Sequence, residues 1–180
     1  CRCDVEVEEV LMELKRYRQI SLTMDSSTYQ GYDISAMWGH YAEKGKGVCL
    51  VFDRHKLLSC LNDNMYSCEV NYKKKYKGYV HITSNNIGRS LERRRKGFFF
   101  TKSIDWKYEQ EYRILTKVDN CYNELFLELK DSLIAVILQY ADSCGDYVSV
   151  NDKVFSSLNF KILSRITERN LLILEYADFF

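Results

Sequence analysis

Hydrophobic residues recur along this chain at two spacings, and each spacing predicts its own kind of element. Apolar side chains at helical spacing predict amphipathic helices over residues 7–14 and 34–41, and a basic helix over residues 84–96. Alternating or continuous apolar runs predict strands at 20–24, 48–52, 66–72, 111–117, 124–129, 133–139, 160–166 and 171–176. Strands and short helices mixed in this way, without strict βαβ alternation, favour the α+β class, with a mixed sheet and short flanking helices.

Polar residues and glycines mark where several of the predicted helices begin and end. Asp33 is placed to cap the helix at 34–41, and Asp53 is placed to cap a short apolar helix that follows it. Asp152 is placed to cap one further helix before the last strands. Gly97 is expected to stop the basic helix ahead of three consecutive phenylalanines. The chain has no proline and only 8 glycines, so Asn, Asp and Ser are expected to supply most of the turns.

The length and composition predict one globular domain. With 180 residues and 46% hydrophobic side chains, the chain can bury a sizeable core as a single α+β domain over residues 1–180, and wholesale disorder is excluded. No run approaches the roughly 18 to 20 apolar residues of a membrane helix, so no membrane partner is expected. Because the sequence does not begin with Met, we expect that an upstream N-terminal segment is missing.

The seven cysteines form an odd-numbered set, which argues against a disulfide scaffold. Several lie in apolar runs, as Cys49 does, where cysteine packs as a small hydrophobic residue. We therefore expect free thiols in a reducing cytoplasm. Cys1 and Cys3 lack a second pair of ligands, and a structural zinc site needs four ligands, so no metal is expected.

Positive charge is concentrated in the middle of the chain. Residues 71–117 hold 13 basic and 4 acidic side chains, although the net charge of the whole chain is only +1. The total argues against a globally basic nucleic-acid-binding protein. The basic middle is either a solvated helix face beside core aromatic residues, or a surface for the phosphates of a nucleotide or nucleic acid. The candidate phosphate contacts are Arg93, Arg94, Arg95 and Lys96.

An aromatic block lies in the second predicted helix. On a helical wheel, Trp38 and Tyr41 share the apolar face with Ile34 and Met37, so they are either core residues or part of a substrate-binding surface. His40 lies roughly 110° from the centre of that face, at its border. A histidine in this position either caps and packs the helix or serves in catalysis.

The segment 106–113 carries two glutamates and an arginine at alternate positions. As a strand, it projects Glu109, Glu111 and Arg113 from one face. This face is either an ordinary polar surface with a Glu–Arg pair, or a carboxylate pair spaced for work on a sugar. In the second case one acid holds a ribose hydroxyl, the other orients the incoming nucleophile, and Arg113 keeps both ionised. Lys102, just upstream, is either solvated or contacts a phosphate of the substrate.

Other enzyme signatures are absent from the sequence. It has no phosphate-binding P-loop, no dinucleotide-binding glycine fingerprint, no nucleophile elbow and no zinc-protease helix. Three histidines without a supporting motif do not assemble a serine or cysteine triad. The segment with the paired glutamates is therefore the more informative one.

Three blocks of the sequence resemble the pattern of a widespread bacterial family of unknown function. That pattern has an M-W-x-H-Y-A block, then K-G-V-C-L-x-F-D, and later K…W-x-Y-E-x-E-Y-R. The chain matches the blocks in the same order at residues 37–42, 46–53 and 102–113. The resemblance covers residues 20–117 well and the C-terminal third loosely. The family's upstream Y-K-Y or H-Y-like strand and its N-D-P-F/E motif do not occur in this chain.

The layout of that family is similar to ADP-ribosyltransferases of the toxin and PARP kind. In those enzymes the closing glutamate of an E-x-E triplet engages the nicotinamide ribose. The resemblance therefore implies NAD as a substrate, Glu111 in that role, and Glu109 as the accessory acid. The family often occurs in settings that resemble bacterial defence or mobile elements, which implies an effector or toxin role, for example in defence against phage.

Two functions follow from these observations. The first is an NAD-using, ADP-ribosyltransferase-like effector, with a cleft where the two glutamates meet the aromatic block and with residues 93–96 nearby. The second is a non-enzymatic module that binds nucleic acid or nucleotide through residues 71–117, with binding that weakens as salt rises. A protein-interaction domain and a nuclease complete the alternatives. The sequence specifies neither a protein partner nor an oligomeric state.

Overall fold

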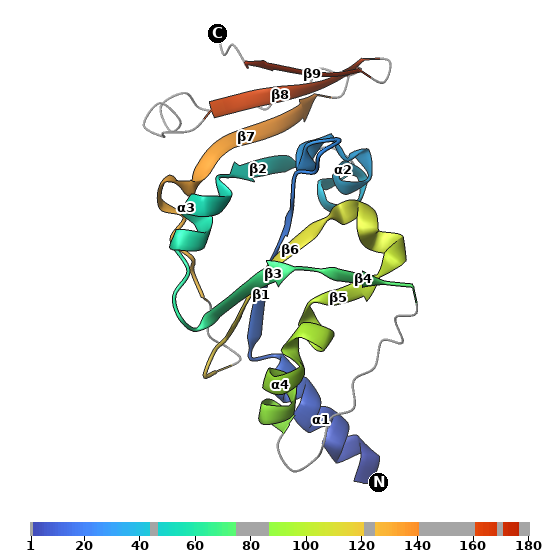
Figure 1. Ribbon diagram of the computed structural model, residues 1–180, viewed down its shortest axis with the longest axis vertical. Coiled ribbons are helices and arrows are strands. Elements are labelled where there is room, and N and C mark those ends of the chain that lie inside the picture. The colour runs from blue at the N-terminus through green and yellow to red at the C-terminus, as the bar shows by residue number, and fades with distance from the viewer. Residues whose placement is uncertain are drawn as a thin grey trace. The chain divides into compact units, whose positions relative to one another are not determined.

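A computed structural model describes residues 2–43, 47–74, 87–120, 125–140, 161–168 and 171–176 of the 180-residue chain. Helices and strands are both present among them, so the α+β class is confirmed (Figure 1). The chain divides into two compact units, and each unit is formed by segments that are separated in the sequence. The first unit combines Cys1–Gly31 with Asn62–Phe126, and the second combines Tyr32–Leu61 with Leu127–Phe180.

The first unit is built on a three-stranded antiparallel sheet in the order β1-β6-β3. A second, two-stranded parallel sheet pairs β4 with β5. The elements are α1 (Arg2–Leu14), β1 (Tyr17–Thr23), β3 (Met65–Glu69), β4 (Asn71–Lys73), α4 (Ile87–Phe99), β5 (Thr101–Ser103), the 3₁₀ helix η3 (Ile104–Glu109) and β6 (Glu111–Lys117).

Strand β6 is the centre of the three-stranded sheet. Its consecutive residues Ile114 and Leu115 are 4% and 1% exposed, and consecutive strand residues point to opposite faces, so both faces of β6 are covered. The register places Ser21 of β1 opposite Arg113 of β6. Helix α4 buries Leu91 completely. The strand is therefore fixed on all sides, and so is the position of Glu111 at its first residue.

The second unit contains a four-stranded mixed sheet in the order β2-β7-β8-β9, in which β7 and β8 run parallel. Its elements are α2 (Ser35–Tyr41), β2 (Val48–Phe52), α3 (Arg54–Ser59), the 3₁₀ helix η4 (Lys130–Ser132), β7 (Leu133–Tyr140), β8 (Lys161–Glu168) and β9 (Leu171–Tyr176). A short 3₁₀ turn, η1 (Gly31–Asp33), precedes α2.

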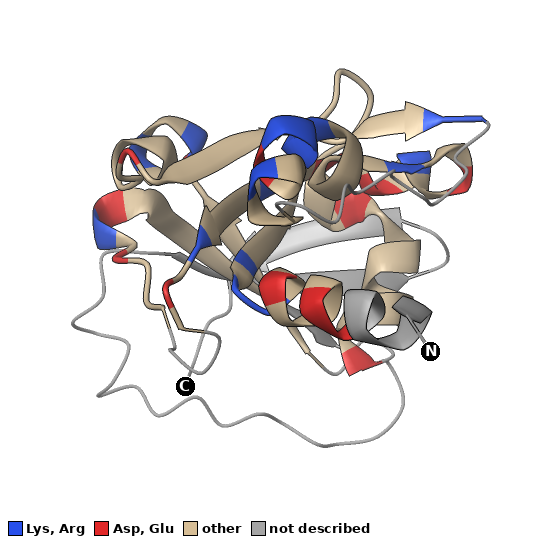
Figure 2. Ribbon diagram, turned by 90° about the horizontal axis from the view of Figure 1, so that it is seen from below, with Lys and Arg blue, Asp and Glu red and all other residues tan. Residues whose placement is uncertain are grey.

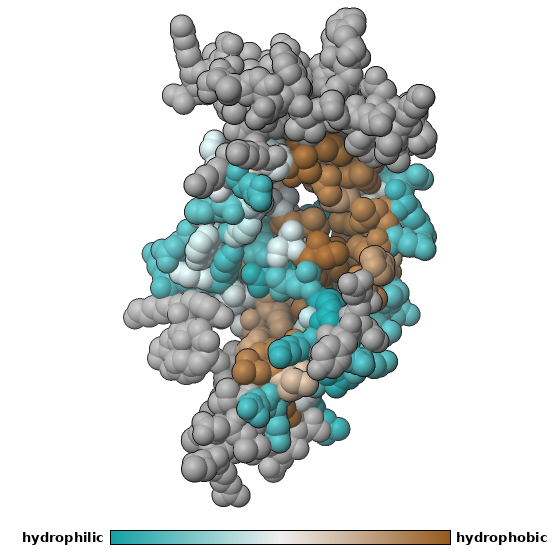
Figure 3. Space-filling model, turned by 180° about the vertical axis from the view of Figure 1, so that it is seen from behind, coloured by the Kyte–Doolittle hydropathy of each residue, from teal (hydrophilic) through white to brown (hydrophobic). Residues whose placement is uncertain are grey.

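The two faces of β2 have different surroundings. Cys49 and Val51 pack against the core formed by Trp38, Ala42 and Ile137. The alternate residues Val48 and Leu50 are 52% and 47% exposed. Figure 3 shows that apolar residues, in brown, do reach the surface on the face that it draws. The continuous apolar run at 48–52 is of the kind that forms a buried strand, and the structure shows that β2 has one partly buried face and one exposed face.

The predicted helix caps differ in outcome. The Asp53 carboxylate accepts the backbone N–H of Lys56 at 3.0 Å, so it caps α3 as predicted. The cap prediction at Asp33 was wrong, because this residue lies in η1 and the N-cap position of α2 is occupied by Ile34, which makes no side-chain cap hydrogen bond.

Two segments that were assigned from sequence adopt other structures. The glycine stop of the basic helix was wrong, because α4 continues through Gly97 to Phe99. A Cβ at Gly97 would meet nothing within 4 Å, so the glycine is neither a close approach nor a cap. The strand predicted at 124–129 was also wrong for residues 125–129, which form no strand. The helix predicted after Asp152 lies outside the described residues.

Candidate functional site

Glu109 and Glu111 are separated by one residue but belong to different elements. Glu109 ends η3 and is 2% exposed, whereas Glu111 begins β6 and is 5% exposed. The strand predicted over 106–113 therefore begins only at Glu111. Gln110 has left-handed backbone angles, φ 45° and ψ 50°, and it turns the chain from the 3₁₀ helix into the strand. For a residue other than glycine such angles cost about 1 kcal/mol, so the fold maintains this turn against strain.

The carboxylate of Glu111 is held ionised by Arg113. The guanidinium donates from Nε to Oε1 at 2.6 Å and from Nη2 to Oε2 at 2.8 Å. Burial raises the pKa of Glu111, but the hydrogen bonds from Arg113 and Ser21 and the charges of Arg113 and Lys102 outweigh it, so the pKa lies below its usual range. The third guanidinium nitrogen donates to the carbonyl of Phe99. Arg113 therefore pairs with Glu111, and its predicted part in a substrate-binding site stays a prediction.

Lys102 of β5 links the two glutamates. Its ammonium makes a short contact with Glu109 and lies 3.5 Å from Oε2 of Glu111. It also lies 4.8 Å from the centre of the Trp106 ring, within the range of a cation–π interaction. The result is a network of two carboxylates and two basic groups, in which Lys102 is 23% exposed and the others less. Lys102 is therefore part of an ion network rather than a freely solvated lysine.

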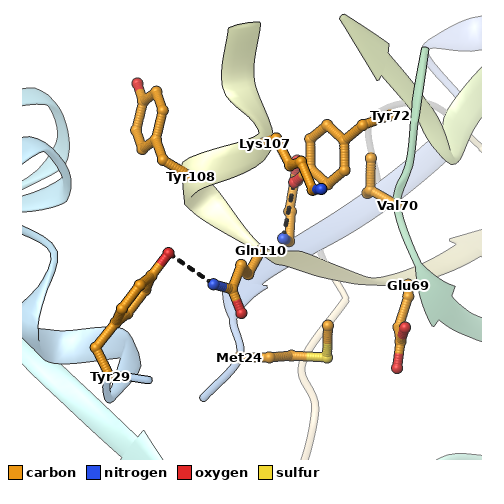
Figure 4. Close-up of a pocket in the computed structure, with 9 residues that line it drawn as sticks. Met24, Tyr29, Glu69, Val70, Tyr72, Lys107, Tyr108 and Gln110 are labelled. Atoms are coloured by element: carbon orange, nitrogen blue, oxygen red, sulfur yellow. Dashed lines mark hydrogen bonds between the residues drawn. The ribbon is translucent and has the colours of Figure 1, made fainter. Parts of the chain in front are cut away.

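A pocket of about 440 Å³ opens beside Glu111 (Figure 4). Small-molecule sites commonly have volumes of this order. Aromatic and polar side chains from four separate stretches of the chain line it: Met24, Tyr29, Glu69, Val70, Tyr72, Lys107, Tyr108, Gln110 and Glu111. Glu109 is not part of this lining, so of the two predicted acids Glu111 is the one at the pocket.

Two tyrosines fix the shape of the pocket wall. The hydroxyl of Tyr72 accepts the backbone N–H of Glu111 at 2.9 Å, and its burial raises the pKa of Tyr72. The side-chain amide of Gln110 donates to the hydroxyl of Tyr29 at 2.8 Å (Figure 4). These contacts anchor both residues that follow Glu109, and they leave the tyrosine rings as part of the lining.

The predicted phosphate-binding residues 93–96 do not form one surface. Arg93, Arg94 and Lys96 are exposed on α4. Arg95 instead stacks over the ring of Tyr66, 3.3 Å from its centre, and pairs with Glu92 at 3.0 Å. Four consecutive residues of a helix cannot all face the same way, because successive residues are rotated by about 100°.

The aromatic block lies in the second unit. Trp38 is 5% exposed and its indole N–H donates to the carbonyl of Tyr32 at 2.7 Å, which is the environment of a core residue. Tyr41 is 63% exposed, which excludes the core alternative for this residue, and its part in a substrate-binding surface stays a prediction. His40 is also exposed and contacts the Tyr41 ring edge-on, with 6.2 Å between the ring centres. The predicted cleft between this block and the two glutamates stays a prediction, as does a catalytic role for His40.

Sequence reasoning did not identify Tyr29, Tyr72 or Gln110 as site residues. The E-Q-E triplet was visible, but its middle residue gave no signal of a left-handed turn, because Gln is not enriched at such positions. The tyrosines come from a loop and from an edge strand that are far from residue 110 in sequence. Only the folded chain brings them to the same pocket.

No cluster of three or more His, Cys, Asp or Glu side chains in the described residues is arranged to hold a metal ion. Among the same residues, none of the helices has both the length and the apolar character needed to cross a bilayer. The cysteines whose side chains are described, Cys49, Cys60 and Cys68, are free thiols.

No curated protein and no solved structure matches the chain. Residues 37–114, from α2 to the middle of β6, match the model of a family described as "Protein of unknown function (DUF2971)". The chain is therefore similar, over this range, to an uncharacterised family, in agreement with the resemblance that its motifs indicated.

Proposed function

We propose that this chain is an NAD-using, ADP-ribosyltransferase-like domain and that the pocket beside Glu111 receives the nicotinamide riboside half of NAD. The observation that carries the proposal is that Glu111, whose carboxylate is buried and held ionised by Arg113, lines a pocket together with three tyrosines.

The carboxylate of Glu111 can accept a ribose hydroxyl without releasing Arg113. Two carboxylate oxygens offer about four lone-pair sites. Arg113 occupies two of these and the hydroxyl of Ser21 a third. Lys102 lies at 3.5 Å, which is longer than a hydrogen bond, so one site is left for a hydroxyl donor.

The pocket lining suits a planar, cationic ring. The rings of Tyr29, Tyr72 and Tyr108 present π faces and edges, on which a pyridinium ring gains both stacking and cation–π attraction. Glu69 and Glu111 contribute two carboxylates to the lining against the single ammonium of Lys107. The oxidised nicotinamide ring carries one positive charge, which this lining favours over a neutral ring.

The reaction breaks the N-glycosidic bond between C1′ of the ribose and N1 of nicotinamide. The electron pair of that bond goes to N1, so the pyridinium leaves as neutral nicotinamide. A lone pair of water or of an acceptor side chain forms the new bond to C1′, and the proton of that nucleophile passes to solvent. The fixed negative charge of Glu111 stabilises the positive charge that develops at C1′.

The E-x-E resemblance supports the same assignment and suggests the biological setting. It gives the ribose contact to Glu111 and an accessory role to Glu109, which acts on the site through their shared partner Lys102. An effector in bacterial defence against phage, or a toxin, is the setting that the resembling family suggests.

The test is NAD consumption by the purified chain, measured as released nicotinamide. Wild type is compared with Glu111→Gln and with Asp63→Asn, which removes an exposed acid outside the pocket. We expect turnover to fall at least about 100-fold in Glu111→Gln, the scale of losing a transition-state charge contact, and to persist in Asp63→Asn. Folded wild-type protein that releases no nicotinamide would overturn the proposal.

A second variant tests the proposal independently if Glu111→Gln does not fold. Tyr108→Ala removes a partly buried ring of the lining and leaves the ion network intact. The expected result is an increase in KM of about tenfold from the lost ring contact. An unchanged KM would place the substrate elsewhere.

A further inference from the structure

Basic residues predominate on the exposed side of helix α4, whose Lys and Arg positions are blue in Figure 2. Arg89, Arg93 and Lys96 follow one another at positions i, i+4 and i+7, and all three are exposed. Residues at these spacings lie on one face of a helix. Leu91, on the opposite face, is 0% exposed and fixes that face against the first unit.

The acid of this helix is engaged elsewhere. Glu92 is the single acidic residue of α4, and its carboxylate accepts the hydroxyl of Tyr17 at 2.9 Å and pairs with Arg95 at 3.0 Å. Like charges at i and i+4 destabilise a helix by a few tenths of a kcal/mol per pair. Glu92 lies three residues after Arg89 and four before Lys96, so it borders this basic row, but its carboxylate is engaged by Tyr17 and Arg95.

The face is also held rigidly. Arg95 lies 3.3 Å over the ring of Tyr66 on β3, and Phe99 packs against Tyr17 of β1 with ring centres 4.6 Å apart. These contacts attach α4 to the central sheet along two of its turns. A preorganised row of charges loses little conformational freedom when it binds a regular anion.

We infer that this face of α4 binds the sugar–phosphate backbone of double-stranded nucleic acid. From residue 89 to residue 96 the helix rises by about 10 Å. One strand of a duplex presents a phosphate every 3.4 Å along the helix axis, so the row corresponds to about three phosphates. The three side chains that match them are Arg89, Arg93 and Lys96. Since such contacts reach only the backbone, binding is independent of base sequence.

An anionic membrane is the other polyanion to consider, and the geometry disfavours it. A helix that lies in a membrane interface presents apolar side chains next to its basic ones. On α4 the apolar side chains turn inward: Leu91 is fully buried and Phe98 and Phe99 are partly buried. The exposed face therefore presents charged side chains and no apolar side chains that could insert into a membrane.

The test is fluorescence anisotropy with a labelled 20-base-pair duplex of arbitrary sequence, between 50 and 200 mM salt. Three neutralised phosphates give a slope of log K against log salt of about −2.7, which is a loss of about 40-fold over this range. The variant Arg89→Gln/Arg93→Gln/Lys96→Gln removes the row. The matched control Arg54→Gln/Lys56→Gln/Lys130→Gln removes three exposed charges of the second unit.

We expect the α4 variant to lose the salt slope and most of the affinity, and the control to keep both. Equal loss in both variants would mean that net charge alone attracts the duplex, and it would overturn the inference. Unchanged binding in the α4 variant, or binding to phosphatidylserine vesicles in place of duplex, would overturn it as well. NAD turnover is measured in parallel, and its presence or absence bears on the pocket alone.

Discussion

Arg113 binds the carboxylate of Glu111 through two hydrogen bonds, 2.6 Å and 2.8 Å long, which two different nitrogens of its guanidinium donate. Both side chains are largely buried, at 13% and 6% exposure. A third nitrogen of Arg113 donates to the carbonyl of Phe99 at the end of α4. This pair therefore connects the acid of the candidate site to both the central strand and the basic helix.

The first prediction concerns the geometry of the two hydrogen bonds between Arg113 and Glu111. Arg113→Lys keeps the charge but cannot reach both oxygens and the Phe99 carbonyl at once, because an ammonium lacks the planar fork. We expect a loss of about 2–3 kcal/mol in the free energy of unfolding, measured by urea titration. Arg16→Lys, at a more exposed pair with Glu13, serves as the control and should lose less than about 1 kcal/mol. Equal losses would contradict the fork argument.

The second prediction concerns pH. The pKa of Glu111 lies below its ordinary value of 4.5 in the folded chain, so the folded state binds fewer protons than the unfolded state in this range. The stability due to Glu111 is thus fully present above about pH 5 and is lost as the pH falls through the folded pKa. The difference in unfolding free energy between wild type and Glu111→Gln should shrink from pH 6 to pH 3. A difference that stays constant over this range would exclude the assignment.

The third prediction concerns the ion pair of Lys102. Lys102→Met leaves the carboxylate of Glu109, 2% exposed, without its cation, and we expect a loss of about 3 kcal/mol. Adding Glu109→Gln removes the buried charge and should restore a good part of that loss. A double-mutant cycle from denaturant titrations measures the coupling. If the second substitution makes the protein still less stable, Lys102 does not act through Glu109.

The fourth prediction separates two residues of the aromatic block. Trp38→Ala removes a side chain that is 5% exposed and should cost about 4 kcal/mol of stability. Tyr41→Ala removes one that is 63% exposed and should change stability by less than about 0.5 kcal/mol. Thermal melts of the two variants test this contrast. Similar losses at both positions would show that Tyr41 packs against something in solution.

The elements of this fold were largely predictable because their signals are local. The apolar patterns of residues 111–117 and 133–139 and the cap at Asp53 each depend on a few neighbouring residues, and the two strands and the cap appear in the structure. The wrong predictions fall on segments whose local sequence is compatible with more than one kind of element. The segment before Glu111 has charges and aromatic residues at both strand and turn spacings, and tertiary contacts through Lys102 select the 3₁₀ helix.

The candidate site was predictable only in part. Glu111 and Arg113 share a face of one strand, so their pairing follows from a period of two. The inward turn of Arg95 depends on Tyr66, which lies on another strand, and the pocket depends on Tyr29 and Tyr72. No periodicity within a segment carries information about which distant segment will lie against it, so these contacts could be learned only from the structure.

The left-handed backbone at Gln110 affects whether a site of this kind can be recognised from its sequence motif. In a straight strand, the first and third residues of an E-x-E triplet lie about 6.7 Å apart, and their side chains project from the same face of the sheet. Here the same letters place one acid at the end of a helical turn and the other in the wall of a pocket. A single pair of backbone angles thus decides which of two carboxylate arrangements the triplet encodes, and a search by sequence spacing cannot distinguish them.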